Sequence, residues 1–188
     1  MNPFRIRRYR PCDHDAVWEL HNLALEATGA HGGSGPWDDD LHHVEEAYLR
    51  SGGEFLVGTL DGRVVAMGAL KRLTEERAEI KRMRVHPDFW RRGFGQRILG
   101  RLERKACESG YRSLVLDTTT GQTAAQELYR GSGYVETGRR RRGPFELILF
   151  EKQLSRGEPG HDALARRHFL FAIVARPFTM EGRPGGRT

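Results

Sequence analysis

The sequence predicts an α/β domain in which helices cover both faces of a mixed β-sheet. Apolar residues at helical spacing alternate along the chain with short apolar runs that are typical of strands. Asp61-Gly62 separates two of these runs and is a strong signal for a two-residue hairpin, which joins antiparallel strands. Residues 78–118 read as strand, turn, helix and strand, a crossover that joins parallel strands. A sheet that contains both kinds of neighbour is mixed.

The first third of the chain predicts an edge strand and two helices. Residues 5–10 form the strand, and Asp13 is suited to cap the helix that follows. The apolar residues of that helix recur at helical spacing, namely Val17, Leu20, Leu23, Ala24 and Ala27. A glycine-rich loop, 29–35, leads to a second, short helix over about residues 41–50.

The middle of the chain predicts three strands, of which the third is irregular. The strands cover 55–60, 63–70 and 78–86. Ala78 and Ile80 are two residues apart, as one face of a strand requires, whereas Met83 and Val85 are shifted from them by an odd number. A β-bulge near Lys81-Arg82 restores the alternation and leaves a strand N–H free to bind a ligand carbonyl. The alternative is a strand that is buried on both faces.

A basic turn separates the third of these strands from the next helix. Pro87 ends the strand because it cannot donate to the ladder. Gly93 and Gly95 allow a tight turn that brings several N–H groups close to a ligand. The helix N-terminus adds partial positive charge, and Arg91 and Arg92 add full charges. This junction is suited to a pyrophosphate; the alternative is an ordinary glycine turn with solvated arginines.

The remaining elements are a buried strand, a helix and a closing hairpin. The strand covers 113–118, and the helix begins near Thr123. The hairpin strands, 134–139 and 145–154, flank an arginine-rich turn, 140–144. The predicted order is therefore β-α-α-β-β-β-α-β-α-β-β.

Composition limits the class of protein. A chain of 188 residues is long enough for one domain with a real core. The net charge of +6 fits a polyanionic cofactor as well as it fits nucleic acid. No run of about 18 apolar residues or secretory signal is present, so we expect no membrane partner. Cys12 and Cys107 suit free thiols, and we expect a cytoplasmic protein without a zinc site.

The C-terminal stretch differs in composition from the rest. We expect a domain over residues 1–154 and an extension over 155–188. Residues 161–176 contain a high density of apolar side chains, which are unfavourable in water. This density predicts a partly helical extension that packs on its own domain or on a second subunit, as in a homodimer.

Two motifs carry a resemblance to a known family. Val85-His86-Pro87 is followed by Trp90–Gly95, and a later stretch, Gln122–Tyr129, is followed by Gly133-Tyr134. The chain over roughly residues 4–154 thereby resembles the GNAT acyltransferase superfamily. The family's cofactor motif is Gln/Arg-x-x-Gly-x-Gly/Ala after a strand ending in Val-x-Pro, and Trp90 stands at its first position. The second signature is Asn-x-x-Ala-x-x-Leu-Tyr and a Gly-aromatic pair, and Gln122 replaces the Asn.

The resemblance implies an activity, a cofactor and a fold. It implies transfer of an acetyl group from acetyl-CoA directly to a primary amine of a small molecule or peptide. It implies a GNAT-type fold in which the strands ending near His86 and Thr118 splay apart, with the pantetheine arm in the gap. The residues implied to bind the cofactor are Met83, Arg84, Val85, Arg91, Arg92, Gly93, Phe94, Gly95, Gln96 and Gln122.

The resemblance also implies two catalytic residues. Tyr129 is expected to act as the general acid, because a phenol with a pKa of about 10 stays protonated at neutral pH and can protonate the leaving thiolate. The alternative for Tyr129 is a core tyrosine. Glu79 is expected to act as the general base that deprotonates the amine, directly or through a water; the alternative is an ion pair with Lys81 or Arg77. His86 is a second candidate for the base.

Two charged runs each allow two interpretations. Asp38, Asp39 and Asp40 follow the glycine-rich loop and can either attract a cationic acceptor or form a solvated helix start. Residues 139–142 are four arginines, which indicate either a nucleic-acid contact or a solvated hairpin turn. The sequence therefore favours an N-acetyltransferase over an acyl-CoA-sensing or nucleic-acid-binding module on the same fold.

Overall fold

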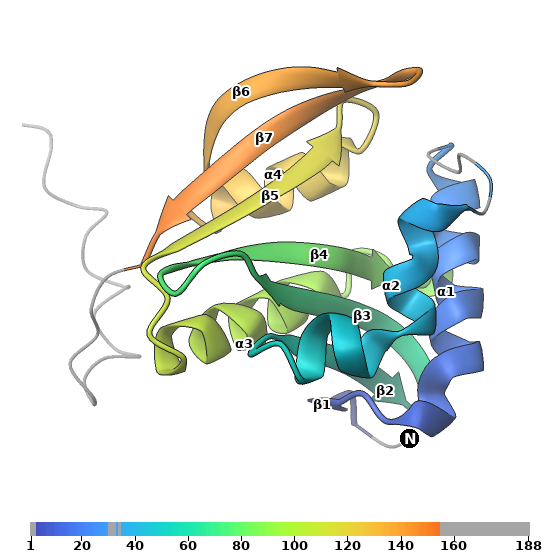
Figure 1. Cartoon of the computed structure of the whole chain (residues 1–188). Helices are drawn as coiled ribbons and strands as arrows, with labels where there is room; N and C mark the ends of the chain where they lie inside the picture. Colours follow the sequence, from blue (N-terminus) through green and yellow to red (C-terminus); the bar gives the residue numbers. More distant parts are fainter. Residues whose placement is uncertain (1–2, 30–32, 34, 155–188) are drawn as a thin grey trace, which may run out of the picture. The chain divides into compact units, whose positions relative to one another are not determined.

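The computed structural model describes residues 3–29, 33 and 35–154, and these form a seven-stranded sheet with helices on both faces (Figure 1). The elements follow the predicted order: β1 (Arg5–Arg8), α1 (His14–Ala27), α2 (Asp39–His42), β2 (Glu54–Leu60), β3 (Arg63–Arg72), β4 (Arg77–Val85), α3 (Phe94–Glu108), β5 (Ser113–Thr119), α4 (Thr123–Gly131), β6 (Val135–Arg142) and β7 (Phe145–Gln153). The predicted extension, 155–188, lies outside the described residues.

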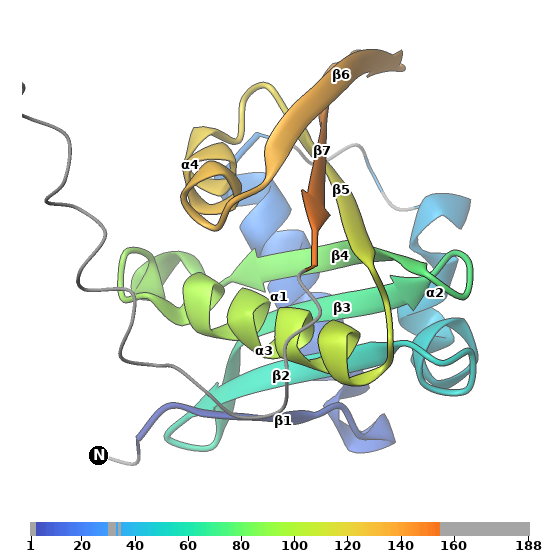
Figure 2. The ribbon, with the colours of Figure 1, turned by 90° about the vertical axis from the view of Figure 1, so that its left-hand side faces the viewer.

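The sheet is mixed, as predicted. Its strand order is β1-β2-β3-β4-β5-β7-β6, and all neighbours are antiparallel except β4 and β5, which the α3 crossover joins in parallel. Figure 2 shows α3 on one face of the sheet and α1 on the other. Each face has its own apolar core, one around Ile98 and Leu102 of α3 and one around Val17 and Leu20 of α1.

The central strands part soon after they meet. The register between β4 and β5 runs only from Arg77↔Ser113 to Glu79↔Val115, although β4 continues to Val85 and β5 to Thr119. The ribbon shows the two strands diverging from this point (Figure 1). The splay that the resemblance implied is therefore present in the fold.

The predicted β-bulge is also confirmed. Ala69 pairs with Lys81 and Met67 pairs with Arg84, so two steps on β3 correspond to three on β4. Arg82 takes up the extra residue in the left-handed region, with φ of 54°. The bulge keeps the apolar side chains of β4 in phase toward α3 and turns Arg82 toward α2.

Two elements differ from the predictions. The second helix is interrupted at His43, and a separate π-helical segment, η3, covers Glu45–Leu49. The interruption accompanies a buried contact in which the Tyr48 hydroxyl donates a hydrogen bond to Asp40. Strand β6 extends to Arg142, because residues 139–142 pair with β7, and the turn shrinks to Gly143-Pro144.

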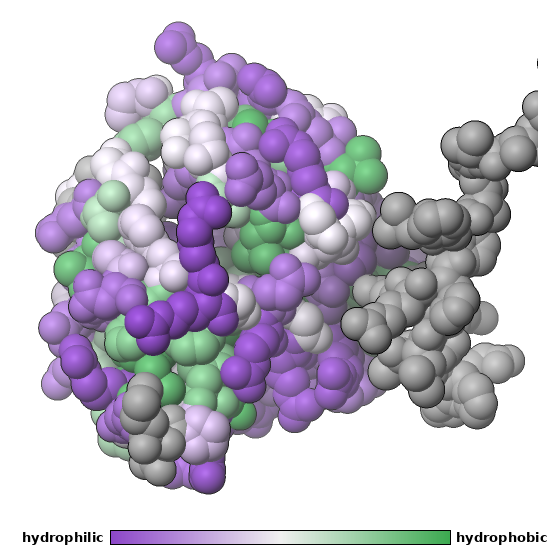
Figure 3. All heavy atoms as spheres, turned by 180° about the vertical axis from the view of Figure 1, so that it is seen from behind, coloured by the Kyte–Doolittle hydropathy of each residue, from purple (hydrophilic) through white to green (hydrophobic). Residues whose placement is uncertain are grey.

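The surface is largely hydrophilic (Figure 3), in keeping with a sequence in which 30% of the residues are charged. Hydrophilic residues surround small hydrophobic areas on the face seen in Figure 3. No helix in the described ranges is long and apolar enough to cross a lipid bilayer.

Candidate functional site

A pocket of about 780 Å³ opens where β4 and β5 part. Its walls come from α1, the loop before α2, β4, the end of β5, α4 and the β6–β7 turn. The two predicted catalytic residues, Glu79 and Tyr129, both line it. Of the predicted cofactor residues, Met83, Arg84 and Gln122 line it as well. The fold thus gathers residues that are far apart in the sequence into one cavity.

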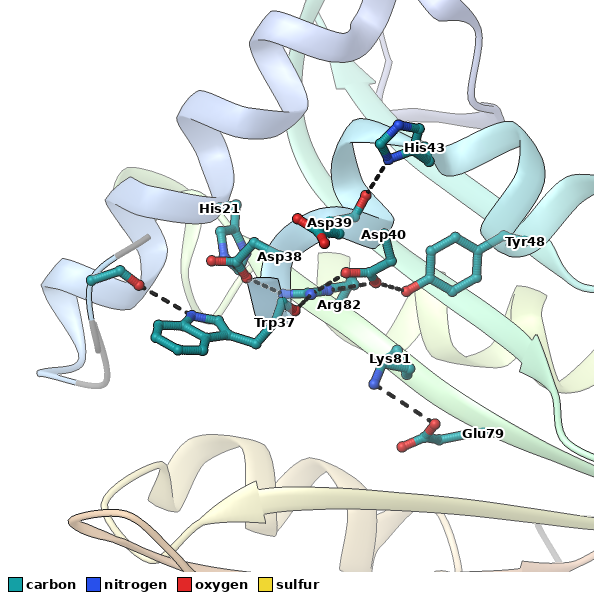
Figure 4. Close-up of polar contacts among 11 residues, drawn as sticks. His21, Trp37, Asp38, Asp39, Asp40, His43, Tyr48, Glu79, Lys81 and Arg82 are labelled. Carbon is teal, nitrogen blue, oxygen red and sulfur yellow. Dashed lines mark hydrogen bonds and ion pairs between the residues drawn. The ribbon is translucent and has the colours of Figure 1, made fainter. Parts of the chain in front are cut away.

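Arg82 fixes one wall of this pocket by bonding to the loop before α2 (Figure 4). Its Nη1 donates to Asp38 Oδ1 at 2.9 Å, its Nε donates to Asp40 Oδ2 at 3.0 Å, and its Nη2 donates to the Trp37 carbonyl at 2.6 Å. Asp40 also accepts the Tyr48 hydroxyl. We call Arg82, Trp37, Asp38, Asp40 and Tyr48 the loop clamp.

The loop clamp shows what Asp38 and Asp40 bind in the folded chain. Asp38 and Asp40 are largely buried and bonded to Arg82, so neither sequence interpretation, an attractor of cations or a solvated helix start, describes them. Burial alone lowers the pKa of Arg82, but its bonds to Asp40 outweigh this and raise the pKa overall. The same pairing lowers the pKa of Asp40 against the effect of burial. Asp39 is exposed and outside the clamp.

His21 is a pocket residue that the sequence analysis missed. It is 1% exposed, and its Nε2 lies 3.3 Å from Asp38 Oδ1 but outside hydrogen-bond geometry. Burial, followed by the positive charges of Arg84 and Arg82, lowers the pKa of His21 to about 4. The imidazole is therefore neutral at pH 7. Its place in the apolar stripe of α1 was the signal that it is buried.

Tyr129 fits both sequence interpretations at once. Its ring packs against Tyr134 and Phe150, with centroid distances of 5.8 and 6.1 Å, and it also lines the pocket. Burial raises the pKa of Tyr129 to about 12, although the charge of Arg84 acts in the opposite direction. The phenol is therefore fully protonated at neutral pH and can donate a proton.

Glu79 lies at the last residue pair before the strands part. The side chain is partly exposed to the pocket, and its Oε2 lies 3.8 Å from Lys81 Nζ (Figure 4). This loose ion pair leaves the carboxylate able to accept a proton or a hydrogen bond. His86 is not among the lining residues; its Nδ1 accepts a hydrogen bond from Asp88 N at 3.3 Å, which is a capping contact.

The basic turn before α3 has the backbone geometry of an anion site. Gly93 caps the helix with φ of 75°, and no side chain caps the first turn. The N–H groups of Phe94, Gly95 and Gln96 therefore lack helical acceptors. The Phe94 ring is buried and stacks on Phe4 at 3.9 Å, so only its backbone can face a ligand.

Two glycines of the turn differ in what the fold requires of them. A Cβ at Gly95 would lie 3.5 Å from Leu128 and 3.6 Å from Val85, which are ordinary contacts. A Cβ at Gly93 meets nothing, but φ of 75° is unfavourable for any other residue. The turn therefore favours glycine at position 93, whereas the fold permits a Cβ at position 95.

The carbonyl groups of β4 that face the gap already have donors from the chain itself. Arg84 Nη1 donates to the Met83 carbonyl at 2.8 Å, and Trp90 Nε1 donates to the Val85 carbonyl at 2.8 Å. A carbonyl has a second lone pair, so these bonds are compatible with a bound pantetheine arm. On the opposite side of the gap, Gln122 lines the pocket, and its Oε1 accepts the Thr118 hydroxyl at 2.8 Å.

The remaining predicted residues lie at the surface. Arg91 is exposed with φ of 58°, and the Arg92 guanidinium lies over the Phe89 ring at 5.2 Å. In the run 139–142, Arg139 Nε donates to Glu136 at 2.8 Å and Arg140 Nη2 donates to Asp117 at 2.7 Å. These carboxylates neutralise part of the basic strand that the sequence offered as a nucleic-acid contact.

Similar proteins are acetyltransferases. An "IAA acetyltransferase" of Azospirillum brasilense is 38% identical over 92 residues, which are 48% of this chain and 57% of that protein. An "N-acetylaspartate synthetase" of Xenopus tropicalis is 30% identical over 101 residues, 53% of this chain and 37% of that protein. The chain thus spans a little more than half of the first curated relative and little more than a third of the second.

A solved structure shows the same fold. The yncA protein of Salmonella typhimurium, described as a putative acetyltransferase with its cofactor acetyl-CoA, superposes with a TM-score of 0.70 at 23% identity, over 86% of this chain and 99% of that one. The family model described as "Acetyltransferase (GNAT) family" matches residues 15–134, which include β4, the basic turn and α4. The chain belongs to the GNAT acetyltransferase family.

Proposed function

We propose that the protein is an acetyl-CoA-dependent N-acetyltransferase that moves the acetyl group directly to a primary amine of a small molecule or peptide. The observation that carries the proposal is the pocket between the parted strands, which Glu79 and Tyr129 line together. The names of the relatives, one of which refers to an N-acetylated amino acid, support transfer to nitrogen.

The site fits acetyl-CoA at both ends of that molecule. The uncapped first turn of α3, with Gly93 as its cap, offers backbone N–H groups to the pyrophosphate. The edges of β4 and β5 beyond Glu79 leave strand backbone unpaired, which suits the amides of a pantetheine arm. Acetyl-CoA supplies an acyl group that is activated as a thioester.

Two proton transfers fall to the residues of the pocket. The amine nitrogen bonds to the acetyl carbon while the carbon–sulfur bond breaks, so the nitrogen loses a proton and the thiolate gains one. Glu79 accepts the proton of the ammonium, directly or through a water. Tyr129 donates to the thiolate. Its raised pKa makes it a weaker acid than free tyrosine, but the same dry surroundings raise the pKa of the thiol.

An amine screen tests the proposal. The protein is incubated with acetyl-CoA and amino acids, amino-acid amides, polyamines, arylalkylamines and short peptides, and release of free thiol is recorded. We expect release with at least one of these classes. A protein that binds acetyl-CoA without acetylating any amine is an acyl-CoA sensor. Nanomolar, sequence-specific binding of duplex DNA at physiological salt contradicts the enzyme assignment in favour of a nucleic-acid module.

Tyr129→Phe tests the chemical step. The substitution keeps the ring and its packing and removes the proton donor, so the single-turnover rate should fall about 10²–10⁴-fold. Acetyl-CoA affinity, measured by calorimetry, should stay within a few fold. Tyr134→Phe is the matched control, because its buried hydroxyl has no hydrogen-bond partner among the described residues and its ring neighbours Tyr129. Equal single-turnover rates for Tyr129→Phe and the parent protein contradict the role.

A further inference from the structure

Arg84 is a pocket residue whose guanidinium is mostly without partners. Its Nε is shielded from solvent and bonds to no described atom, and its Nη1 donates to the Met83 carbonyl. No carboxylate in the described ranges lies within 4.0 Å of it. A guanidinium has five N–H groups and always carries its charge at neutral pH, so most of this donor capacity is unused.

Most other charges of the pocket lining are already matched. Arg82 is bonded to Asp38 and Asp40 in the loop clamp, and Lys81 lies 3.8 Å from Glu79. Asp117, on the opposite wall, accepts Arg140. Among the described cations that line the cavity, Arg84 and Arg142 lack a carboxylate partner; Arg142 is exposed at the β6–β7 turn, whereas the Nε of Arg84 is shielded from solvent.

Neighbouring groups respond to this excess of positive charge. Burial and the charge of Arg82 lower the pKa of Arg84 to about 10. The charges of Arg84 and Arg82 add to burial in lowering the pKa of His21. An isolated charge is costly in a dry site unless a ligand of opposite sign pairs with it.

We propose that Arg84 binds a carboxylate of the acceptor, which makes the acceptor an amino acid. This inference rests on the proposed function, since it names the class of amine that the same pocket takes. A carboxylate matches the fork of the guanidinium and can accept two of its N–H groups. The phosphates of the cofactor have their own site at the turn before α3, beyond the end of β4. The amine of the same acceptor faces Glu79, which lies on the same strand and lines the same pocket.

The experiment compares amino acids with their amides. Each α-amino acid and its carboxamide, together with β-alanine and β-alaninamide, is tested as acceptor, and kcat/KM is measured for both members of a pair. The amide keeps the amine and removes the charge that Arg84 recognises. We expect the parent protein to prefer at least one amino acid over its amide by about 10- to 100-fold, the range for a hydrogen bond to a charged group.

Variants show which side chain is responsible for the preference. Arg84→Gln should abolish the preference for the acid over the amide, and Arg84→Lys should restore part of it. Arg101→Gln, an exposed position on α3, should leave the preference as in the parent protein. Lys81→Gln and Arg142→Gln test the two other lining cations that lie outside the loop clamp. A preference that disappears in Lys81→Gln or Arg142→Gln and persists in Arg84→Gln overturns the assignment to Arg84.

A binding measurement separates this inference from the proposed function. Amino acids are titrated into the protein saturated with CoA, which carries no acetyl group, and heat or NMR line broadening is recorded. Binding that Arg84→Gln abolishes supports the inference even when no amine is acetylated, in which case the proposed function alone fails. Acetylation of amines with equal kcat/KM for acids and amides overturns the inference while the proposed function stands. If amino acids neither bind nor react, the inference is wrong.

Discussion

At the scale of single residues, His21 and Arg84 lie in the pocket without the partners that such side chains usually have. Both ring nitrogens of His21 and the Nε of Arg84 are buried and lack hydrogen bonds to the described residues. Buried polar groups of this kind are infrequent in folded proteins because each costs free energy. Both residues line the pocket, so polar groups of a bound ligand or water can become their partners.

His21 should make stability depend on pH. Its pKa is lowered from 6.5 to about 4 in the folded chain, so the unfolded chain binds more protons between these values. The contribution of the neutral His21 to the free energy of unfolding is present above pH 6.5 and is lost as the pH falls toward 4. The free energy of unfolding should decrease by about 2 kcal/mol between pH 7 and pH 5. Urea unfolding at both pH values measures this decrease, and His21→Gln should remove most of it. An equal decrease in the variant contradicts the prediction.

At the scale of elements, the bulge in β4 joins a strand to a loop. The left-handed Arg82 is displaced from the strand register and bonds to the loop before α2, so the position of that loop is tied to β4. The loop supplies Trp37 and Asp38 to the pocket wall. The β-bulge at Arg82 thus holds in place the wall of the pocket that the loop before α2 provides.

Arg82→Gln should destabilise the domain through the carboxylates that it leaves behind. Asp38 and Asp40 would then be buried without a cation, and the expected loss is about 3 kcal/mol in the free energy of unfolding. Arg50→Gln is the control, because Arg50 pairs with Glu45 and Glu46 at the surface. Its loss should stay below about 1 kcal/mol. Similar losses for the two variants in urea unfolding would show that the clamp contributes no more than a surface pair.

The sequence predicted the order of the elements because periodicity and turn residues are local signals. The phase shift between Ile80 and Met83 was enough to predict the bulge, and Gly93 was enough to predict the turn. The interruption at His43 was not predictable, since it accompanies a contact between Tyr48 and Asp40 that depends on the folded chain.

The candidate site was predictable where a motif exists and not elsewhere. Glu79 and Tyr129 were named from a family pattern, and the structure places both in one pocket. The partners of Asp38 and Asp40 were not foreseen, because Arg82 is more than forty residues away in the chain and nothing local links them. The same holds for Arg84, which was assigned to the cofactor by its position in the strand.

At the scale of the whole domain, two blocks of sheet are joined by a short seam. Strands β1 to β4 form one block and strands β5, β7 and β6 the other, and the seam consists of the pairs from Arg77↔Ser113 to Glu79↔Val115. Beyond it, the strands expose unpaired backbone to the gap. A ligand that pairs with both edges therefore adds to the stability of the whole sheet.

Binding of CoA should be visible as local protection of this gap. Amide hydrogen exchange should slow in β4 beyond Glu79 and in the first turn of α3, while the β6–β7 turn should be unaffected. Gly93→Ala should require a higher CoA concentration for the same protection, because φ of 75° costs a residue with a side chain about 1–2 kcal/mol. Gly100→Ala, at an exposed position of α3 where a Cβ meets nothing within 4 Å, is the matched control. Protection confined to other elements contradicts the location of the cofactor.

The parted strands also carry a risk of aggregation. An unpaired strand edge invites another chain to add a strand, and this domain carries two such edges inside its own fold. The Arg84 guanidinium and the Trp90 indole bond to the carbonyls of Met83 and Val85 on one of them. Each of these side-chain donors takes up one lone pair of a carbonyl and places a bulky group beside the edge, which should make the addition of a foreign strand less favourable.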